Sequence, residues 1–163
     1  MRDEDFKRLY AEHAQPLLGF LAYRTGDRAL AMDLLADTFE RALTARRPFD
    51  RRKASEKTWL YTIALNLLRD HTRRTAAGRR ALERVLAGEQ EQRPASAFDA
   101  VEHRVVVQQA LECLSEEERE VIALRYGADL TVPEIAKLTR LKLTTAEGRL
   151  YRALRKLKDE LEW

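Results

Sequence analysis

A run of polar and basic side chains near the end of the chain has the types and spacing needed to bind nucleic acid. Arg149, Arg152 and Lys156 fall at i, i+3 and i+7, so on a helix they share one face. Such a face can neutralise phosphates, while polar residues at the front of the helix meet base edges in the major groove. An ordinary helical hairpin with a solvated basic face remains the alternative. The candidate DNA-contacting residues are Lys142, Thr144, Thr145, Glu147, Gly148, Arg149, Arg152 and Lys156.

The segments that must position this run predict a helix-turn-helix. A short helix is expected at 132–138, then a tight connection at 139–143, then the basic helix to about residue 161. Helices at 100–113 and 116–126 should precede them, the second ended by Gly127. The inner face of the basic helix should hold Leu150, Ala153, Leu154 and Leu157. Capping boxes are expected at Ser115 with Glu118, Thr131 with Glu134, and Thr144 with Glu147.

The first part of the chain predicts a second helical module. Amphipathic patterns indicate helices at 3–25, 28–45 and 56–74, with Asp27 and Ser55 as N-caps. Pro16 should break or kink the first helix near residues 13–15. Trp59, Leu60, Ile63 and Leu67 should point inward from the third helix.

The helical periodicity is lost over residues 76–98, which contain Gly78, Gly88 and Pro94. We expect a flexible linker there, with a short helix at 79–87. Fully extended, it would reach about 75 Å. The fold class is therefore all-α, in two small modules at 1–75 and 99–163 joined by the linker 76–98.

The charge pattern suits a protein that touches a polyanion at two places. The net charge is only +3, but residues 41–57 carry seven Lys or Arg against Asp50 and Glu56. Residues 137–158 carry eight against Glu147, and residues 112–120 are acidic. Solvated helix faces would give the same pattern, so charge alone leaves both interpretations open.

Catalysis is not expected. His13, His71 and His103 are far apart and match no metal-binding or catalytic spacing, and no phosphate-binding glycine loop is present. Cys113 is the only cysteine, which excludes a disulfide framework and a multi-cysteine metal site. We therefore expect no catalytic residue, no metal ligand and no cofactor. The charged N-terminus and the lack of a long apolar run predict a cytoplasmic protein without membrane insertion.

Two sets of motifs resemble the extracytoplasmic-function (ECF) group of bacterial sigma factors. Residues 6–74 resemble the family's region 2, with the motifs DLLADTF (33–39), TWLYTIALN (58–66) and DHTRR (70–74). Residues 110–161 resemble region 4. The resemblance implies a sigma factor that binds core RNA polymerase and directs initiation at promoter DNA, with an anti-sigma factor as a further partner.

The resemblance also implies residue roles. Region 4 would bind the −35 element through the DNA-contacting residues given above. Region 2 would bind polymerase and the −10 element, but a solvated acidic face, a buried amide at Asn66 or a helix end capped by arginines would explain the same residues. The polymerase-binding residues would be Asp33, Leu34, Asp37, Thr38, Glu40 and Arg41. The −10-binding residues would be Arg52, Lys53, Asn66, Asp70, Arg73 and Arg74.

Four positions depart from the family pattern. Glutamine is usual where Ala36 stands, and Arg or Lys is frequent where Leu65 stands, so a polymerase contact and part of the −10 face would be lost. Glycine is usual at Arg140 and a small polar cap at Lys142, so either a strained turn at Arg140 or a turn of different geometry is expected there. Two other classes remain open: a stand-alone helix-turn-helix regulator that never touches polymerase, and a degenerate sigma paralogue that sequesters a regulator.

Overall fold

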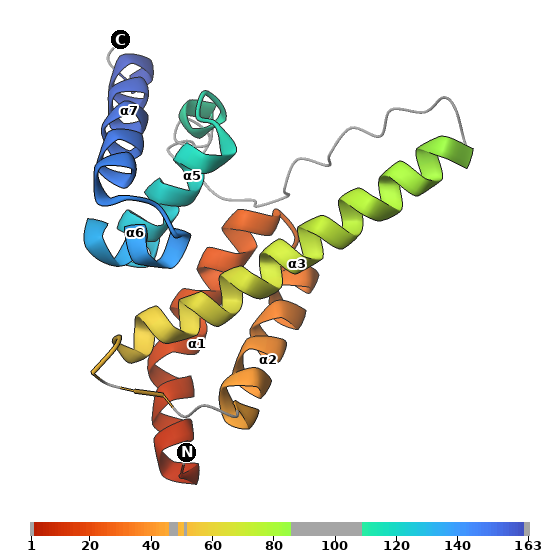
Figure 1. The fold of residues 1–163 in the computed structure, drawn as a ribbon, viewed down its shortest axis with the longest axis vertical. Coiled ribbons are helices and arrows are strands. Elements are labelled where there is room, and N and C mark those ends of the chain that lie inside the picture. The colour runs from red at the N-terminus through yellow and green to blue at the C-terminus, as the bar shows by residue number, and fades with distance from the viewer. Residues whose placement is uncertain (1, 46–48, 51, 86–108, 162–163) are drawn as a thin grey trace. The chain divides into compact units, whose positions relative to one another are not determined.

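All regular structure in the described residues is helical. This computed structural model describes residues 2–45, 49–50, 52–85 and 109–161. The chain divides into two compact units, 1–96 and 97–163, and Figure 1 shows the helices of each. The all-α prediction is confirmed.

Helix α1 (Asp3–Thr25) runs without interruption through Pro16, so the predicted break near residues 13–15 is wrong. Proline removes the amide that would bond to the carbonyl of Glu12. Both Glu12 and Pro16 lie on the exposed side of α1, where water can satisfy that carbonyl. Packing of the other face, including the buried Leu17 and Leu21, keeps the helix continuous.

The N-terminal unit packs α1 and α2 (Arg28–Thr44) against α3, which begins at Glu56. Both predicted N-caps are present: the Asp27 carboxylate accepts from the amides of Ala29 and Leu30, and Ser55 Oγ accepts from the amide of Thr58 at 3.1 Å. The core is apolar, and each buried leucine contributes roughly 2 kcal/mol. Its most deeply buried members include Leu17, Leu21, Leu60, Tyr61 and Leu65. Of the residues expected to face inward, Leu60 and Leu67 are buried, while Trp59 and Ile63 are half-buried.

Tyr61 provides a test of this core. Its ring packs edge-on against Phe20 at 5.2 Å, and its hydroxyl has no hydrogen-bond partner among the described residues. Tyr61→Phe should therefore raise the free energy of unfolding by about 1 kcal/mol, measured by urea titration at pH 7. Burial raises the pKa of Tyr61 to about 12 from 10.0, so the wild type should lose stability from pH 10 to 12 as the unfolded phenol ionises first.

The Tyr61→Phe variant should lose less stability over that alkaline range. Tyr10→Phe serves as the control because Tyr10 is 48% exposed, so its hydroxyl is already hydrated. Equal effects of the two substitutions would contradict the burial of the Tyr61 hydroxyl.

Helix α3 is longer than predicted. It spans Glu56–Val85, so its expected end at residue 74 is wrong, and residues 76–85 of the expected linker are helical. Ala76, Ala77 and Ala81 favour this continuation, as do the arginines between them. The short helix predicted at 79–87 is thus part of α3 as far as Val85, and residues 86–98 lie outside the described residues.

The C-terminal unit begins its described part with helical residues 109–112, and most of the helix predicted at 100–113 lies outside the described residues. Helix α5 (Glu116–Ile122) opens with the predicted capping box of Ser115 and Glu118. It continues into a π-helical turn, η1 (Ala123–Gly127), in which the amide of Ala128 donates to the carbonyl of Ala123 at 3.0 Å. The helical residues end at Gly127, as predicted, and the left-handed residue that follows is Asp129, with φ 53°.

The helix-turn-helix consists of α6 (Val132–Thr139) and α7 (Leu143–Leu161). The capping box of Thr131 and Glu134 is confirmed. The predicted box at Thr144 and Glu147 is wrong, because α7 already begins at Leu143 and the carbonyl of Lys142 accepts from the amide of Ala146 at 3.0 Å.

On the inner face of α7, Ala153 is fully buried and Leu150 and Leu157 pack against the same cluster. Leu154 is 38% exposed, so its predicted inward position is wrong.

Arg140 ends α6 in the left-handed conformation, with φ 57°. A side chain in this conformation costs roughly 1 kcal/mol or more. Arg140→Gly should therefore raise the free energy of unfolding of the C-terminal unit by about 0.5–1 kcal/mol, measured by thermal or urea melts. The same change at Lys137, exposed inside α6, should lower it by about 1 kcal/mol. A loss of stability in both variants would contradict the strain at Arg140.

Candidate nucleic-acid interface

The front of α7 presents the polar residues that were predicted to meet base edges. Thr144, Thr145 and Glu147 are exposed, while Ala146 between them is fully buried. Ala146, together with Ala136 and the buried Ile135 of α6, fixes the two helices close together. The turn is held by the amide of Leu141, which donates to the carbonyl of Ala136 at 2.9 Å. The first turn of α7 is thus rigidly placed at the surface, as entry into a groove requires.

The basic face of α7 is also present, although its members differ. Arg152 is exposed and Arg149 is half-buried. Gly148 gives the Arg152 side chain room to lie across it, since a Cβ at that glycine would come within 3.3 Å of Arg152 Nη1. Gly148 therefore leaves space for the arginine side chain instead of contacting DNA through a side chain of its own. Arg152 is exposed and well placed to bind a phosphate.

Lys156 takes part in a contact that the sequence analysis missed. Its Nζ donates to Glu118 Oε2 at 2.9 Å, and this joins α7 to the N-terminus of α5. The same carboxylate accepts from the amide of Ser115, and the hydrogen bond from Lys156 is the main cause that lowers the pKa of Glu118 below its usual value. Two residues 38 positions apart carry no local sequence signal, whereas the capping role of Glu118 was visible.

Four of the predicted −10 residues lie on α3, between positions 66 and 74. Asn66 and Asp70 are half-buried, and Arg73 and Arg74 are exposed. Because α3 continues to Val85, the alternative in which the two arginines only cap a helix end is excluded. Leu65 is 1% exposed and belongs to the core, so its departure from the family pattern does not remove charge from this surface, contrary to expectation.

The turn before α3 exposes Arg52 and Lys53. The amide of Arg52 donates to Asp50 Oδ1 at 3.0 Å, and Lys53 Nζ lies 3.9 Å from the same carboxylate. Both side chains are thus exposed at the surface just before α3.

The outer face of α2 carries the predicted acidic stripe, since Asp33, Asp37 and Glu40 are all exposed, as is Arg41. Leu34 and Thr38 are not on this face. They are 4% and 0% exposed, and Thr38 Oγ1 donates to the carbonyl of Leu34 at 2.6 Å. They shape the core beneath the stripe and are not available for direct contact with a partner.

Exposed apolar residues that the sequence analysis missed lie beside these acids on α2. Met32 is 54% exposed and Leu43 is 51% exposed, with the exposed Ala36 between them. Their spacing along α2 places them on the same face as the acidic stripe. The signal was therefore present in the sequence, as apolar residues outside the buried face.

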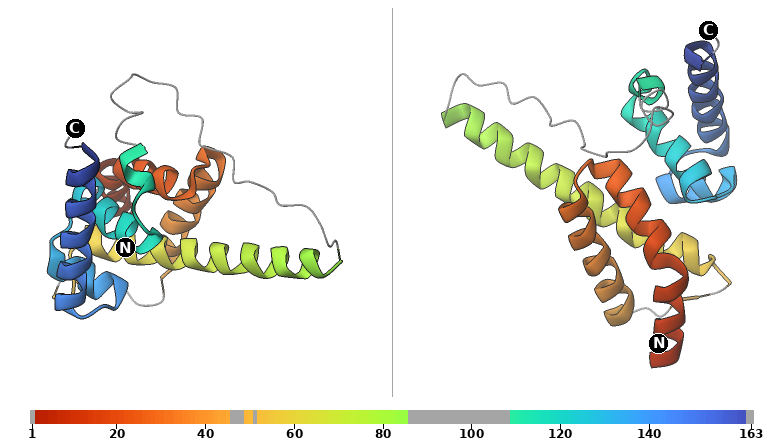
Figure 2. Two further views of the ribbon diagram at one scale, coloured as in Figure 1. Left: turned by 90° about the horizontal axis from the view of Figure 1, so that it is seen from above. Right: turned by 180° about the vertical axis from the view of Figure 1, so that it is seen from behind.

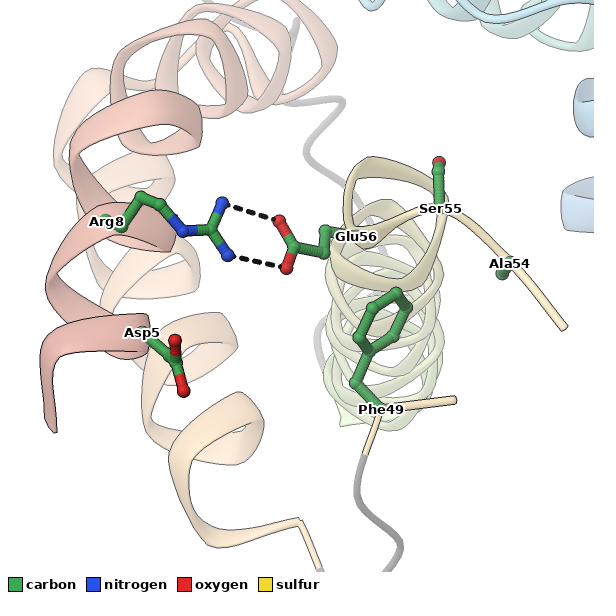
Figure 3. A pocket seen from close by; sticks show the side chains of 6 residues that line it. All are labelled: Asp5, Arg8, Phe49, Ala54, Ser55 and Glu56. Carbon is green, nitrogen blue, oxygen red and sulfur yellow. Dashed lines mark hydrogen bonds and ion pairs between the residues drawn. The ribbon is translucent and has the colours of Figure 1, made fainter. Parts of the chain in front are cut away.

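A small pocket lies where α1 faces the start of α3 (Figure 3). It has a volume of about 540 Å³ and is lined by Asp5, Arg8, Phe49, Ala54, Ser55 and Glu56. A paired bond closes one side, because Arg8 Nη2 and Nη1 donate to the Glu56 carboxylate at 2.7 and 3.0 Å. The bond to Glu56 is the main cause that raises the pKa of Arg8.

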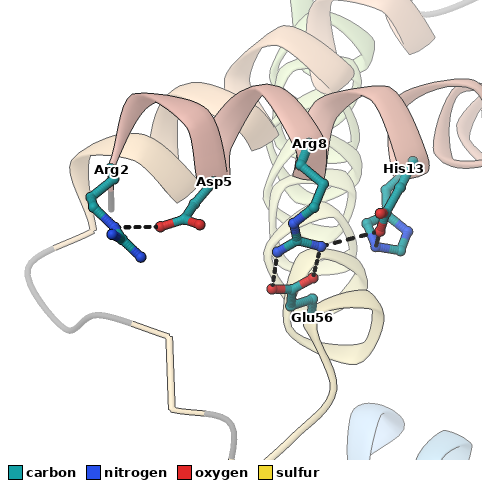
Figure 4. Close-up of polar contacts among 6 residues, drawn as sticks. Arg2, Asp5, Arg8, His13 and Glu56 are labelled. Carbon is teal, nitrogen blue, oxygen red and sulfur yellow. Dashed lines mark hydrogen bonds and ion pairs between the residues drawn. The ribbon is translucent and has the colours of Figure 1, made fainter.

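Glu12 and His13 lie next to this pair: Arg8 Nη1 is 3.3 Å and His13 Nε2 is 3.8 Å from Glu12 Oε2. Figure 4 labels Arg8, His13 and Glu56. Potential ligand atoms of Glu12, His13 and Glu56 lie within 4.8 Å of one another. The guanidinium of Arg8 already pairs with both carboxylates, and burial lowers the pKa of His13. Through the Arg8–Glu56 pair, this group links α1 to the start of α3.

Comparison with known proteins decides the family. Residues 9–78 match the model of Sigma-70 region 2, and residues 104–157 match that of Sigma-70 region 4. The chain belongs to the ECF sigma factors of the sigma-70 family. It is a sigma factor that directs transcription initiation with RNA polymerase, and like the rest of this non-enzymatic family it has no catalytic activity of its own.

The sigma factor is similar to curated relatives over nearly its whole length. It is 31% identical to SigL of Mycobacterium tuberculosis, covering 96% of this chain and 88% of SigL. It is 30% identical to SigX of Bacillus subtilis, covering 98% and 85%. It is also 29% identical to BldN of Streptomyces coelicolor, of which it spans 58%.

Two solved structures share the sigma factor's fold. The sigma factor RpoE, in complex with the anti-sigma factor NepR from Bartonella quintana, has a TM-score of 0.77 at 23% identity and covers 98% of both chains. CnrH, in complex with the cytosolic domain of CnrY, has a TM-score of 0.69 at 24% identity, covering 99% of this chain and 90% of the other. None of the described helices has the length and apolar character of a membrane span.

Proposed function

We propose that the sigma factor divides promoter recognition between its two units. In the N-terminal unit, Asn66, Asp70, Arg73 and Arg74 of α3, with Arg52 and Lys53 before it, hold the −10 element. In the C-terminal unit, the front of α7 enters the major groove of the −35 element. The observation that carries this proposal is that both units, matched to regions 2 and 4 in order, expose polar and basic side chains on one helix each.

The two DNA-binding helices would act differently. Asn66 offers an amide donor and acceptor beside exposed arginines, which suits an unstacked base on a phosphate backbone. On α7, Thr144, Thr145 and Glu147 reach outward at the front, where base edges are read. Arg149 and Arg152 then position the helix through phosphates.

Polymerase would bind the outer face of α2. Asp33, Asp37, Glu40 and Arg41 supply the charges, and Met32 and Leu43 supply apolar contacts beside them. Reversing Asp33 and Asp37 to lysine should weaken binding to core polymerase in the absence of DNA. Asp159→Lys, an exposed reversal on α7, should leave that affinity unchanged.

A reconstituted run-off assay tests the proposal directly. Purified sigma factor and core polymerase on genomic fragments should give transcripts from defined starts. No gain over core polymerase alone would refute the proposal. The selected promoter then allows residue tests: Arg152→Ala should weaken binding to all promoter variants alike, and Thr145→Ala should relax preference at one base pair. Lys158→Ala, on another face of α7, is the control.

A stand-alone regulator is the second candidate, and it makes the opposite prediction. Such a protein binds a short site tightly by itself. The sigma factor should bind free promoter DNA poorly, because without polymerase its two units are not held at promoter spacing. Tight binding without polymerase would favour the regulator, and polymerase binding without initiation would favour a sequestering paralogue.

An anti-sigma factor is the expected regulatory partner, and the cytoplasm the expected compartment. The support is that RpoE and CnrH, which share the fold, were each solved with another chain bound, in the first case an anti-sigma factor. A pull-down from cells that express a tagged sigma factor, repeated with purified candidates, tests this expectation. A candidate that binds without lowering run-off transcription is not an anti-sigma factor.

A further inference from the structure

The last part of α3 extends beyond the helical bundle. Among the described side chains of α3, Leu68 is the last that is buried, yet the helix continues to Val85. At about 1.5 Å per residue, this extension is roughly 25 Å long. Figures 1 and 2 show it continuing past both α1 and α2. From Thr72 on, the described side chains of α3 are exposed apart from the half-buried Ala76, so this part of the helix is available to a partner.

The extension is strongly basic. Arg79, Arg80 and Arg84 follow Arg73 and Arg74 along α3, and all five side chains are exposed. In the described part of the chain, Arg73, Arg79, Arg80 and Arg84 form no ion pair. Leu82 is the large apolar residue it exposes, so an apolar groove in another protein is a poor match. A polyanion is the partner that fits this surface.

Helix geometry sorts these arginines into faces. At about 100° per residue, Arg73, Arg80 and Arg84 fall within roughly 40° of Asn66 around the axis. Arg79 lies about 140° from Asn66 on the far side. Arg73 and Arg84 are roughly 16 Å apart along the axis, which matches about five nucleotide steps of ~3.4 Å. The basic face is therefore an extension of the same face that carries Asn66.

We propose that the face formed by Arg73, Arg80 and Arg84 binds backbone phosphates of the duplex just upstream of the −10 element. The proposal rests on the −10 role of α3. The chain leads from the end of α3 to the unit assigned to the −35 element, which lies upstream, so the extension belongs on that side of Asn66. Contacts to phosphates would add affinity at any sequence and fix the register of Asn66 on the −10 element.

The test uses holoenzyme formed from core polymerase and the full chain, with the promoter fragment selected in the run-off assay. Binding is measured as a function of salt for the wild type, the Arg80→Ala/Arg84→Ala double variant and Arg79→Ala. Each lost phosphate contact lowers the slope of log affinity against log salt by about 0.9, so the double variant should lose about 2. Arg79→Ala should keep the wild-type slope. Alanine preserves the helix, and these positions are exposed, so all three proteins should fold.

A second measurement locates the contact. Replacing the phosphates immediately upstream of the −10 element by neutral methylphosphonates should weaken DNA binding by the wild-type holoenzyme, and should weaken the double variant much less, because the variant keeps only Arg73 of this face. An unchanged slope in the double variant overturns the proposal, as does equal weakening of both proteins. Loss of affinity of the double variant for core polymerase without DNA also overturns it, and assigns the face to polymerase. Failure of the wild type to initiate at all is a different result, which refutes the proposed function itself.

Discussion

Leu65→Arg should unfold the N-terminal unit of the sigma factor. Leu65 is 1% exposed between α3 and the rest of the bundle, so the arginine would be buried without a partner. Such a change costs more than about 4 kcal/mol, which is a large part of the stability of a small domain. Circular dichroism during urea unfolding should show the loss, and binding to core polymerase should disappear with it.

Leu82→Arg is the matched control for this prediction. It makes the same substitution on the same helix, but Leu82 is 59% exposed, so the free energy of unfolding should change by less than about 0.5 kcal/mol. A Leu65→Arg variant as stable as Leu82→Arg would show that Leu65 lies at the surface, as the family pattern had suggested.

Glu118→Ala should destabilise the C-terminal unit by about 2 kcal/mol. The carboxylate holds the amide of Ser115 at 2.9 Å and the ammonium of Lys156 at 2.9 Å, so one substitution removes a helix cap and the link between α5 and α7. The cap accounts for about 1 kcal/mol, and the partly exposed ion pair for up to about 1 kcal/mol. Urea unfolding of the full chain should measure the loss in its C-terminal transition.

The pH dependence of stability provides a second test of the contacts made by Glu118. Because the folded-state pKa of Glu118 lies below its ordinary value of 4.5, the stabilisation is present above about pH 4.5 and is lost as pH falls through the folded pKa. Glu118→Ala should flatten this acid loss. Glu117→Ala, in the exposed first turn of α5, is the control and should cost about 0.5 kcal/mol at most. Similar acid profiles for the two variants would contradict the role of Glu118.

The starts of helices were predictable from the sequence because local chemistry determines them. Asp27, Ser55, Ser115 and Thr131 all cap as expected, since a cap needs only a side chain and the amides two or three residues later. The predicted cap at Thr144 is absent, and the reason is again local. The left-handed Arg140 sets where α6 ends, α7 begins three residues later, and the threonine falls inside its first turn.

Helix ends and buried faces were harder to predict, because they depend on partners distant in sequence. The arginines near residue 74 resemble a helix terminus, yet the following alanine-rich segment continues α3. The burial of Leu34, Thr38 and Leu65, and the exposure of Leu154, are decided by which helices pack against them. The residue roles in DNA and polymerase binding stay predictions.

Because α3 is one continuous helix, the direction of each of its side chains around the helix axis is fixed relative to all the others. One residue inserted after Ala76 would turn Arg80 and Arg84 by about 100° relative to Asn66, whereas seven would turn them by only about 20°. If both ends of α3 bind one surface, an insertion of seven residues should therefore be tolerated better than an insertion of one. Related chains that use both ends of the helix on one surface should differ here by heptads.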